Sequence, residues 1–299
     1  MGLPNRQQHY LPSFYLAGFT HNGLRDGKLH VFDREQQISW CSKPNKTARQ
    51  NNFYTLDDDV NGDSMFVEKT LSTLETGWAL ALKLATQNRV LPTGKQLEDL
   101  IVFAAFTAVR TKWFRERCSK RIDGREKERL RHLLAGSPNL SYASFKSALP
   151  NLSEQDYEQF KAFAETDDYE ISYDNTWHTQ RMIATAIWFF EILAERSWAI
   201  WFSDGSTPEL ICSDSPVAFT RLEDGPSPVT PIQLSENTIF SLPLDKRTAL
   251  VSMIDRQIPS VRINAREVSL INGETMRYAN QVFSPSPDFN WQTPIGHAG

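Results

Sequence analysis

The chain has 299 residues, enough for one large domain or two modest ones. Its hydrophobic fraction of 40% and charged fraction of 23% are those of an ordinary globular protein, and its net charge of −4 gives no overall sign of a nucleic-acid-binding protein. Three cysteines without CxxC spacing argue against a disulfide framework or a structural zinc site. No signal-like or membrane-spanning apolar run occurs, so we expect a cytoplasmic protein without a membrane partner.

The predicted elements begin with a hairpin and a loop in residues 1–63. Asp26-Gly27 is typical of a hairpin turn, and Lys28–Asp33 alternates apolar and polar residues as a half-buried strand does. Arg34–Gln37 is predicted to form a second turn, which leads into a strand at Ile38–Trp40. We expect this hairpin to join the antiparallel sheet that is predicted from Trp198 to Met253.

A long amphipathic helix is predicted from Ser64 to Asn88. Its apolar residues recur at spacings of three and four: Val67, Leu71, Leu74, Trp78, Ala81, Leu82 and Ala85. Glu68 and Glu75 are seven residues apart, close to two helical turns, so both carboxylates project in nearly the same direction. That direction is the rim of the apolar stripe, where a carboxylate can reach a partner on another element.

The next helix begins near Gln96 and is predicted to be central, because Leu100–Val109 is apolar on every side. Arg110 interrupts this apolar run. A buried guanidinium without a partner is very costly, so we expect a carboxylate opposite it, with Glu68 and Glu75 the nearest candidates. The pair is either a structural bridge between packed helices or part of a charge cluster at an active or phosphate-binding site.

A basic stretch follows, from Lys112 to Leu134, and Gly124 is expected to divide it into two helices. It holds nine cations: Lys112, Arg115, Arg117, Lys120, Arg121, Arg125, Lys127, Arg129 and Arg131. They form either a solvated helix face or a strip that contacts a phosphate backbone. Short helices are expected at 141–148 and 154–164.

Asn175–Arg196 is the next predicted helix, and it carries His178 in its first turns. His178 is either a satisfied structural histidine or a neutral base or ligand, since a helix N-terminus lowers the pKa of an imidazole.

From residue 197 the pattern changes to that of strands in an antiparallel meander. The predicted strands are Ser197–Phe202, Glu209–Cys212, Val217–Phe219, Thr238–Pro243 and Thr248–Met253. Asp214 lies where a strand enters a proline-containing turn, so it either braces that turn or delivers a carboxylate to a site. Asn264–Ala279 fits both a hairpin at Asn272-Gly273 and a helix, and we favour the helix.

Several short segments, taken in their order, resemble the bacterial domain-of-unknown-function family 4238 over nearly the whole chain. They are His9-Tyr10-Leu11-Pro12, Phe14-Tyr15-Leu16, Leu29 to Arg34, Asn52-Phe53-Tyr54, Glu68, Glu75, Phe106 to Arg110 and Ser213-Asp214-Ser215-Pro216-Val217. The resemblance implies no established activity. It carries the suggestion of a role in bacterial conflict, such as phage defence.

Together these patterns predict an α+β fold, with a helical core at 64–196 beside an antiparallel sheet, helix and tail at 197–299. We expect one integrated domain over 1–299, and the alternative is a helical domain with a separate β domain. The chain lacks the P-loop, GxGxxG, HExxH and GxSxG motifs, which argues against the enzyme classes that use them.

Two functional hypotheses remain open. In the first, the protein is a nuclease-like hydrolase of phosphodiesters or nucleotides, and Arg110 stabilises developing negative charge. Its acid–base and metal groups would be His9 or His178 for proton transfer, and Glu68, Glu75 and Asp214 as base or as ligands of a divalent cation. In the second, the protein is a non-catalytic sensor or interaction protein, and the same charges form a buried network that fixes the packing. The oligomeric state stays open, a dimer included.

Overall fold

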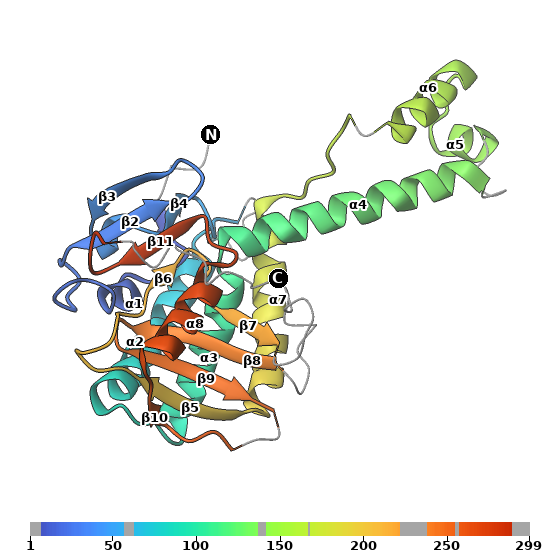
Figure 1. Ribbon diagram of the computed structural model, residues 1–299. Coiled ribbons are helices and arrows are strands. Elements are labelled where there is room, and N and C mark those ends of the chain that lie inside the picture. Colours follow the sequence, from blue (N-terminus) through green and yellow to red (C-terminus); the bar gives the residue numbers. More distant parts are fainter. Residues whose placement is uncertain are drawn as a thin grey trace, which may run out of the picture. The chain divides into compact units, whose positions relative to one another are not determined.

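The computed structural model describes residues 7–56, 63–136, 142–166, 168–221, 238–254 and 257–288 (Figure 1). The chain forms two compact units, and we describe each by itself. The larger unit contains residues 1–114 and 175–299, and the smaller contains residues 115–174. The elements are helices and largely antiparallel sheets, which confirms the predicted α+β class.

A five-stranded sheet forms one side of the larger unit, in the order β10-β5-β9-β8-β7 (Figure 1). Its strands are β5 (Ser197–Phe202), β7 (Ala218–Arg221), β8 (Thr238–Asp245), β9 (Thr248–Met253) and β10 (Val261–Arg262). β7, β8, β9 and β5 pair antiparallel, and only the short β10 pairs parallel, with β5. The predicted antiparallel meander is therefore confirmed for β7, β8 and β9, whereas β5 pairs with β9 and not with the strand that follows it in the chain.

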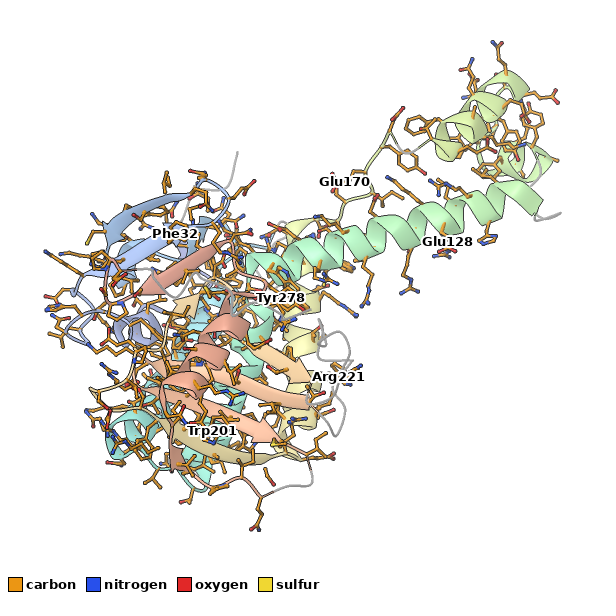
Figure 2. The ribbon with its side chains drawn as sticks, in the orientation of Figure 1. Phe32, Glu128, Glu170, Trp201, Arg221 and Tyr278 are labelled. Atoms are coloured by element: carbon orange, nitrogen blue, oxygen red, sulfur yellow. The ribbon has the colours of Figure 1, made fainter. Side chains whose placement is uncertain are left out.

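A second sheet of the larger unit has the order β3-β2-β11-β6 and is antiparallel throughout. Its strands are β2 (Leu29–Asp33), β3 (Ile38–Ser42), β6 (Cys212–Ser213) and β11 (Gln281–Ser284). Figure 2 labels Phe32 on β2 in this sheet and Trp201 on β5 in the other. The expectation that the N-terminal hairpin joins the meander is wrong, because the late strand β11 lies between the hairpin and β6.

Two local predictions in these sheets also need correction. The turn of the β2–β3 hairpin is at 34–37, as predicted, but Asp26-Gly27 follows a helix, α1 (Ser13–Ala17), and joins no pair of strands. Leu210 and Ile211 are fully buried, yet only Cys212 and Ser213 of that region pair as a strand. An apolar run of this length marks burial and does not by itself distinguish a strand from a packed loop.

Three helices pack together in the larger unit: α2 (Phe66–Asn88), α3 (Lys95–Val109) and α7 (Asn175–Ala194). α3 contacts both α2 and α7, and most of its residues are buried, as its all-round apolar sequence predicts. One continuous core joins these helices to the N-terminal segment and the sheets, with Tyr15, Trp78, Phe103, Phe189 and Phe240 all less than 2% exposed. The favoured helix near residue 270 is also present, as α8 (Ala265–Met276).

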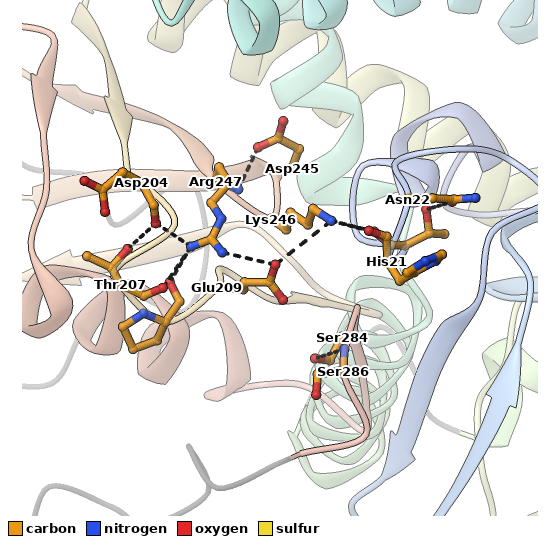
Figure 3. Close-up of polar contacts among 12 residues, drawn as sticks. His21, Asn22, Asp204, Thr207, Glu209, Asp245, Lys246, Arg247, Ser284 and Ser286 are labelled. Atoms are coloured by element: carbon orange, nitrogen blue, oxygen red, sulfur yellow. Dashed lines mark hydrogen bonds and ion pairs between the residues drawn. The ribbon is translucent and has the colours of Figure 1, made fainter.

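The turn between β8 and β9 is fastened to neighbouring loops by two cations (Figure 3). Lys246 Nζ donates to the carbonyl oxygen of His21 at 2.5 Å. Arg247 Nη1 donates to the carbonyl oxygen of Asp204 at 2.6 Å, and its Nη2 donates to Glu209 Oε1 at 3.2 Å. Most of these acceptors are main-chain carbonyls, so we interpret this cluster as structural.

The smaller unit consists of most of α4 (Lys112–Gly136) with α5 (Tyr142–Ala148) and α6 (Glu154–Glu165). Its small core is formed by Leu134, Tyr157 and Ala164. α4 is one continuous helix, so the predicted break at Gly124 is wrong. A single glycine costs a helix about 1 kcal/mol, which the neighbouring turns of a long helix can offset.

Gly124→Ala is expected to raise the free energy of unfolding by up to about 1 kcal/mol, because alanine is the better helix former. A Cβ at this position would meet nothing within 4 Å, so the substitution adds no clash. Urea unfolding followed by far-UV circular dichroism measures the change. A destabilised variant would contradict the continuous, open helix at this position.

Within the residues that the structure describes, no helix has the length and apolar character needed to cross a membrane.

Candidate functional site

The site is built around a short two-stranded ribbon next to α2. β1 (Gln7–His9) pairs antiparallel with β4 (Arg49–Asn51). Gln8, in the middle of β1, is 1% exposed, and both the nitrogen and the oxygen of its side-chain amide form hydrogen bonds. Its Nε2 donates to Glu68 Oε2 at 2.8 Å, and its Oε1 accepts from the main-chain N–H of Tyr54 at 2.6 Å. Gln8 therefore ties Glu68 on α2 to the loop that carries Tyr54.

Arg110 lies at the point where α3 ends, and it is 3% exposed. Its Nε donates to Tyr54 Oη at 2.9 Å, and both Nη1 and Nη2 donate to Glu75 Oε1 at 3.1 Å. Nη2 also donates to the carbonyl oxygen of His9 at 3.2 Å. The predicted carboxylate partner is therefore present, and it is Glu75. We call Gln8, His9, Tyr54, Glu68, Glu75 and Arg110 the Arg110 cluster.

The surroundings of Arg110 favour its charged form. Burial by itself lowers the pKa of the guanidinium, but Tyr54 and Glu75 outweigh it, so the pKa is raised overall. The guanidinium carbon lies 5.3 Å from the ring centroid of Tyr54 and 6.0 Å from that of Trp78, within range of cation–π attraction. Because the Glu75 side chain is 27% exposed, solvent reaches the cluster on the carboxylate side.

The surroundings of the His9 imidazole favour its neutral form. Burial and the nearby charge of Arg49 lower its pKa below the ordinary value of 6.5, and they outweigh Glu75 and the main chain of Pro44 and Asn45, which raise it. Its Nε2 atom is buried and has no hydrogen-bond partner in the described part of the chain. A neutral imidazole with an unused ring nitrogen is able to accept or pass on a proton.

Asp214 is a buried carboxylate at the end of β6, 6% exposed. Burial raises its pKa to about 6, although main-chain N–H groups and Lys112 act in the opposite direction. Its Oδ1 accepts from the main-chain N–H of Asn280 at 3.0 Å, so it braces the start of β11 across the fold. Lys112 Nζ lies 5.5 Å from the ring centroid of Tyr10, the residue after His9, so the cation that acts on Asp214 also contacts the N-terminal segment.

His178 lies in the first turns of α7 and is not a member of the Arg110 cluster. Its ring packs edge to face on that of Trp177, with the centroids 5.2 Å apart. Asn175, at the start of the same helix, donates from Nδ2 to the carbonyl oxygens of Asn52 and Thr55. The first turn of α7 is therefore fixed to the loop that carries Tyr54.

Comparison with known proteins places this arrangement in a family. The model of a family described as a protein of unknown function, DUF4238, matches residues 7–286. The chain belongs to the DUF4238 family. The match begins at β1 and ends just after β11, so it includes the whole Arg110 cluster and Asp214. Searches among curated proteins and among solved structures gave no match.

The three carboxylates predicted as metal ligands have other partners in this DUF4238 chain. Glu75 binds Arg110, Glu68 accepts from Gln8, and Asp214 accepts from a main-chain N–H. Over the ranges that the structure describes, no group of three or more His, Cys, Asp and Glu side chains could hold a metal ion. The use of Glu68, Glu75 and Asp214 as one set of ligands therefore has no support from their placement.

Some polar residues of the DUF4238 site are hard to find from sequence. Gln8 and Tyr54 complete the Arg110 cluster. The need of a buried arginine for several acceptors was a signal for Tyr54, but not for Gln8, which contacts Glu68 and the main chain of Tyr54. Arg196 was missed altogether. It is 5% exposed, donates to Ser252 Oγ at 2.6 Å, and has a buried Nη1 without a hydrogen-bond partner among the described residues. Its signal resembles that of Arg110, a cation directly after an apolar helix.

Proposed function

We propose that this DUF4238 protein is a hydrolase of phosphodiesters or nucleotides, with His9 as its central acid–base group. The observation that supports it best is the His9 imidazole, whose Nε2 is buried and has no hydrogen-bond partner among the described residues, and whose pKa is lowered by burial. A group that accepts a proton in a transition state works best when its pKa lies near the working pH. A histidine whose pKa is lowered from 6.5 is largely deprotonated at pH 7.

The other cluster residues take roles that fit their contacts. His9 would accept the proton of a water molecule as the water oxygen attacks phosphorus and the ester bond between phosphorus and the leaving oxygen breaks, with solvent protonating the leaving oxygen. Arg49, Arg110 and Lys112 supply positive charge around His9 and Asp214, which suits an anionic substrate. Arg110 would act as a positioning residue, because four hydrogen bonds within the protein already use its guanidinium.

The carboxylates have supporting roles within this proposal, and His178 is the alternative group for proton transfer. Asp214, with a pKa of about 6, would serve as a second base close to neutral pH. Glu75 would orient His9 and face the substrate from its exposed side. A divalent cation would need further ligands from substrate or water. We extend the proposal to a bacterial, cytoplasmic setting and to phage defence, on the family resemblance alone.

A non-catalytic sensor or interaction protein is the second candidate, and one observation favours it. Arg110 is 3% exposed, and four of its five N–H groups donate within the protein. A buried ion network of this kind can serve conformational specificity without any chemistry. In that case the lowered pKa of His9 is a consequence of burial and serves no catalytic step.

A substrate panel tests the proposal. The full chain would be incubated with bis(p-nitrophenyl) phosphate, nucleotides, and DNA and RNA oligonucleotides, with and without Mg²⁺, Mn²⁺ or Zn²⁺. We expect cleavage whose rate rises with pH and levels off, with an apparent pKa below 6.5, because the neutral form of His9 is the active one. No cleavage of any substrate, or a rate that falls as His9 loses its proton, would contradict the proposal.

A further inference from the structure

The exposed face of α4 carries a cluster of positive charge that the site above does not use. Six residues of α4 between 116 and 126 are exposed, and four of them are cations, one is a glycine and one is an acid: Glu116, Arg117, Lys120, Arg121, Gly124 and Arg125. Figure 2 shows the side chains of α4 projecting from the helix. The whole chain has a net charge of −4, so the positive charge of this face is opposite in sign to that of the chain.

Of the three acidic residues between 116 and 126, Glu116 is exposed at the start of the stretch, whereas Asp123 is engaged on another side of the helix. Asp123 accepts from the main-chain N–H of Ile171 at 2.8 Å and pairs with Lys127 at 3.1 Å. Lys127 is 8% exposed, and its Nζ lies 4.8 Å from the ring centroid of Tyr169. Asp123 and Lys127 therefore lie on the side of α4 that contacts Ile171 and Tyr169, and they form an ion pair with each other there.

Three of the exposed cations differ from Lys127 in this respect. Lys120, Arg121 and Arg125 form no ion pair in the part of the chain that the structure describes. Arg117 and Arg125 are each four residues from Arg121, and like charges at this spacing destabilise a helix. Acidic residues flank this part of the helix, with Glu116 before it and the Glu126–Arg129 pair after it, so the exposed residues from 117 to 125 carry positive charge alone.

Gly124 adds a second unfavourable feature to the same face. It lies among Lys120, Arg121 and Arg125, and a Cβ there would meet nothing within 4 Å, so packing inside the protein does not require a glycine. A glycine at the centre of a cationic face lets a bound group approach the helix backbone closely. Both features therefore indicate a ligand that lies outside the chain.

We infer that this face of α4 binds the phosphate backbone of nucleic acid. The span from Arg117 to Arg125 is about 12 Å of helix, and the same length of duplex carries about seven phosphates. The inference deepens the proposed hydrolase, because it names a polynucleotide as the substrate. It concerns binding, however, and is measured separately from cleavage.

Fluorescence anisotropy of the full chain with a labelled 20-base-pair DNA duplex, and with one of its single strands, tests the inference. We expect binding to either probe at 50 mM NaCl that weakens about 40-fold at 200 mM, the dependence for roughly three phosphate contacts to a duplex. The triple variant Lys120→Glu, Arg121→Glu, Arg125→Glu is expected to bind at least ten-fold more weakly at 50 mM.

A matched variant controls for overall charge. Arg25→Glu, Lys83→Glu, Arg266→Glu makes the same charge change at exposed positions of the larger unit and is expected to bind like wild type. Circular dichroism melting shows whether both variants are folded.

The inference is overturned if wild type binds neither probe at 50 mM NaCl, if the α4 variant binds like wild type, or if the control variant loses as much. Different results would contradict the binding inference and the proposed hydrolase activity. Cleavage of bis(p-nitrophenyl) phosphate without polynucleotide binding would overturn the inference alone. Binding through α4 without cleavage of any substrate would overturn the hydrolase alone.

Discussion

Replacing Glu75 with alanine is expected to lower the free energy of unfolding by about 3 kcal/mol, the lower end of the range for breaking a buried ion pair. The variant would leave Arg110, 3% exposed, without its carboxylate. The loss stays at the lower end because Tyr54 and the His9 carbonyl still accept from the guanidinium, and because the Glu75 side chain is 27% exposed. Urea unfolding measures the change.

Two further variants show whether the cost comes from the orphaned charge. Glu191→Ala, at an exposed position of α7, is expected to change the stability by less than about 0.5 kcal/mol. Adding Arg110→Met to Glu75→Ala removes the orphaned charge and is expected to restore part of the loss. A Glu75→Ala variant as stable as Glu191→Ala would show that the ion pair contributes little.

Asp214→Asn is expected to gain stability over wild type as the pH rises from about 4 to 7. The pKa of this buried carboxyl group is about 6 in the folded protein against an ordinary value of 3.8. Its contribution to stability is therefore fully present below pH 3.8 and is lost as the pH rises through about 6. The gap corresponds to roughly 3 kcal/mol, and asparagine avoids this loss while keeping an acceptor for Asn280.

The comparison uses the difference in unfolding free energy between variant and wild type at each pH, so that the other titrating groups cancel. Asp26→Asn, at an exposed turn position, is expected to show no comparable trend. A pH-independent difference for Asp214→Asn would mean that the carboxyl group is not perturbed by burial. A variant that is more stable at pH 7 but loses cleavage would mark Asp214 as retained for chemistry.

Much of the fold follows from periodicity in the sequence. The boundaries of β5 and β9 are as predicted, and the apolar run of α3 is buried as expected. The partner of Arg110 was predictable as a carboxylate, because a buried guanidinium needs one. The choice between Glu68 and Glu75 was not, because both project in the same direction from α2. The structure shows that the partner is Glu75, and that Glu68 instead accepts a hydrogen bond from Gln8 on a distant strand.

The remainder depends on contacts between distant segments. β11 pairs with the N-terminal hairpin about 250 residues earlier, and no local pattern indicates that β6 joins this sheet and leaves the meander. Arg110 ends α3 instead of continuing it, because its side chain reaches Tyr54 and Glu75 at once. The pKa values of His9 and Asp214 likewise depend on burial that the complete fold creates.

Cleavage by His9→Ala, measured beside its stability, separates the two candidate functions most directly. Arg110 contacts the main-chain carbonyl of His9, so the variant removes the imidazole and leaves that hydrogen bond in place. His30→Ala on β2 is the matched control, since His30 is also a partly buried strand histidine. If His9 is catalytic, His9→Ala lowers kcat/KM by about 100-fold or more while both variants stay folded. If His9→Ala cleaves phosphodiesters as fast as His30→Ala, His9 is not the catalytic base.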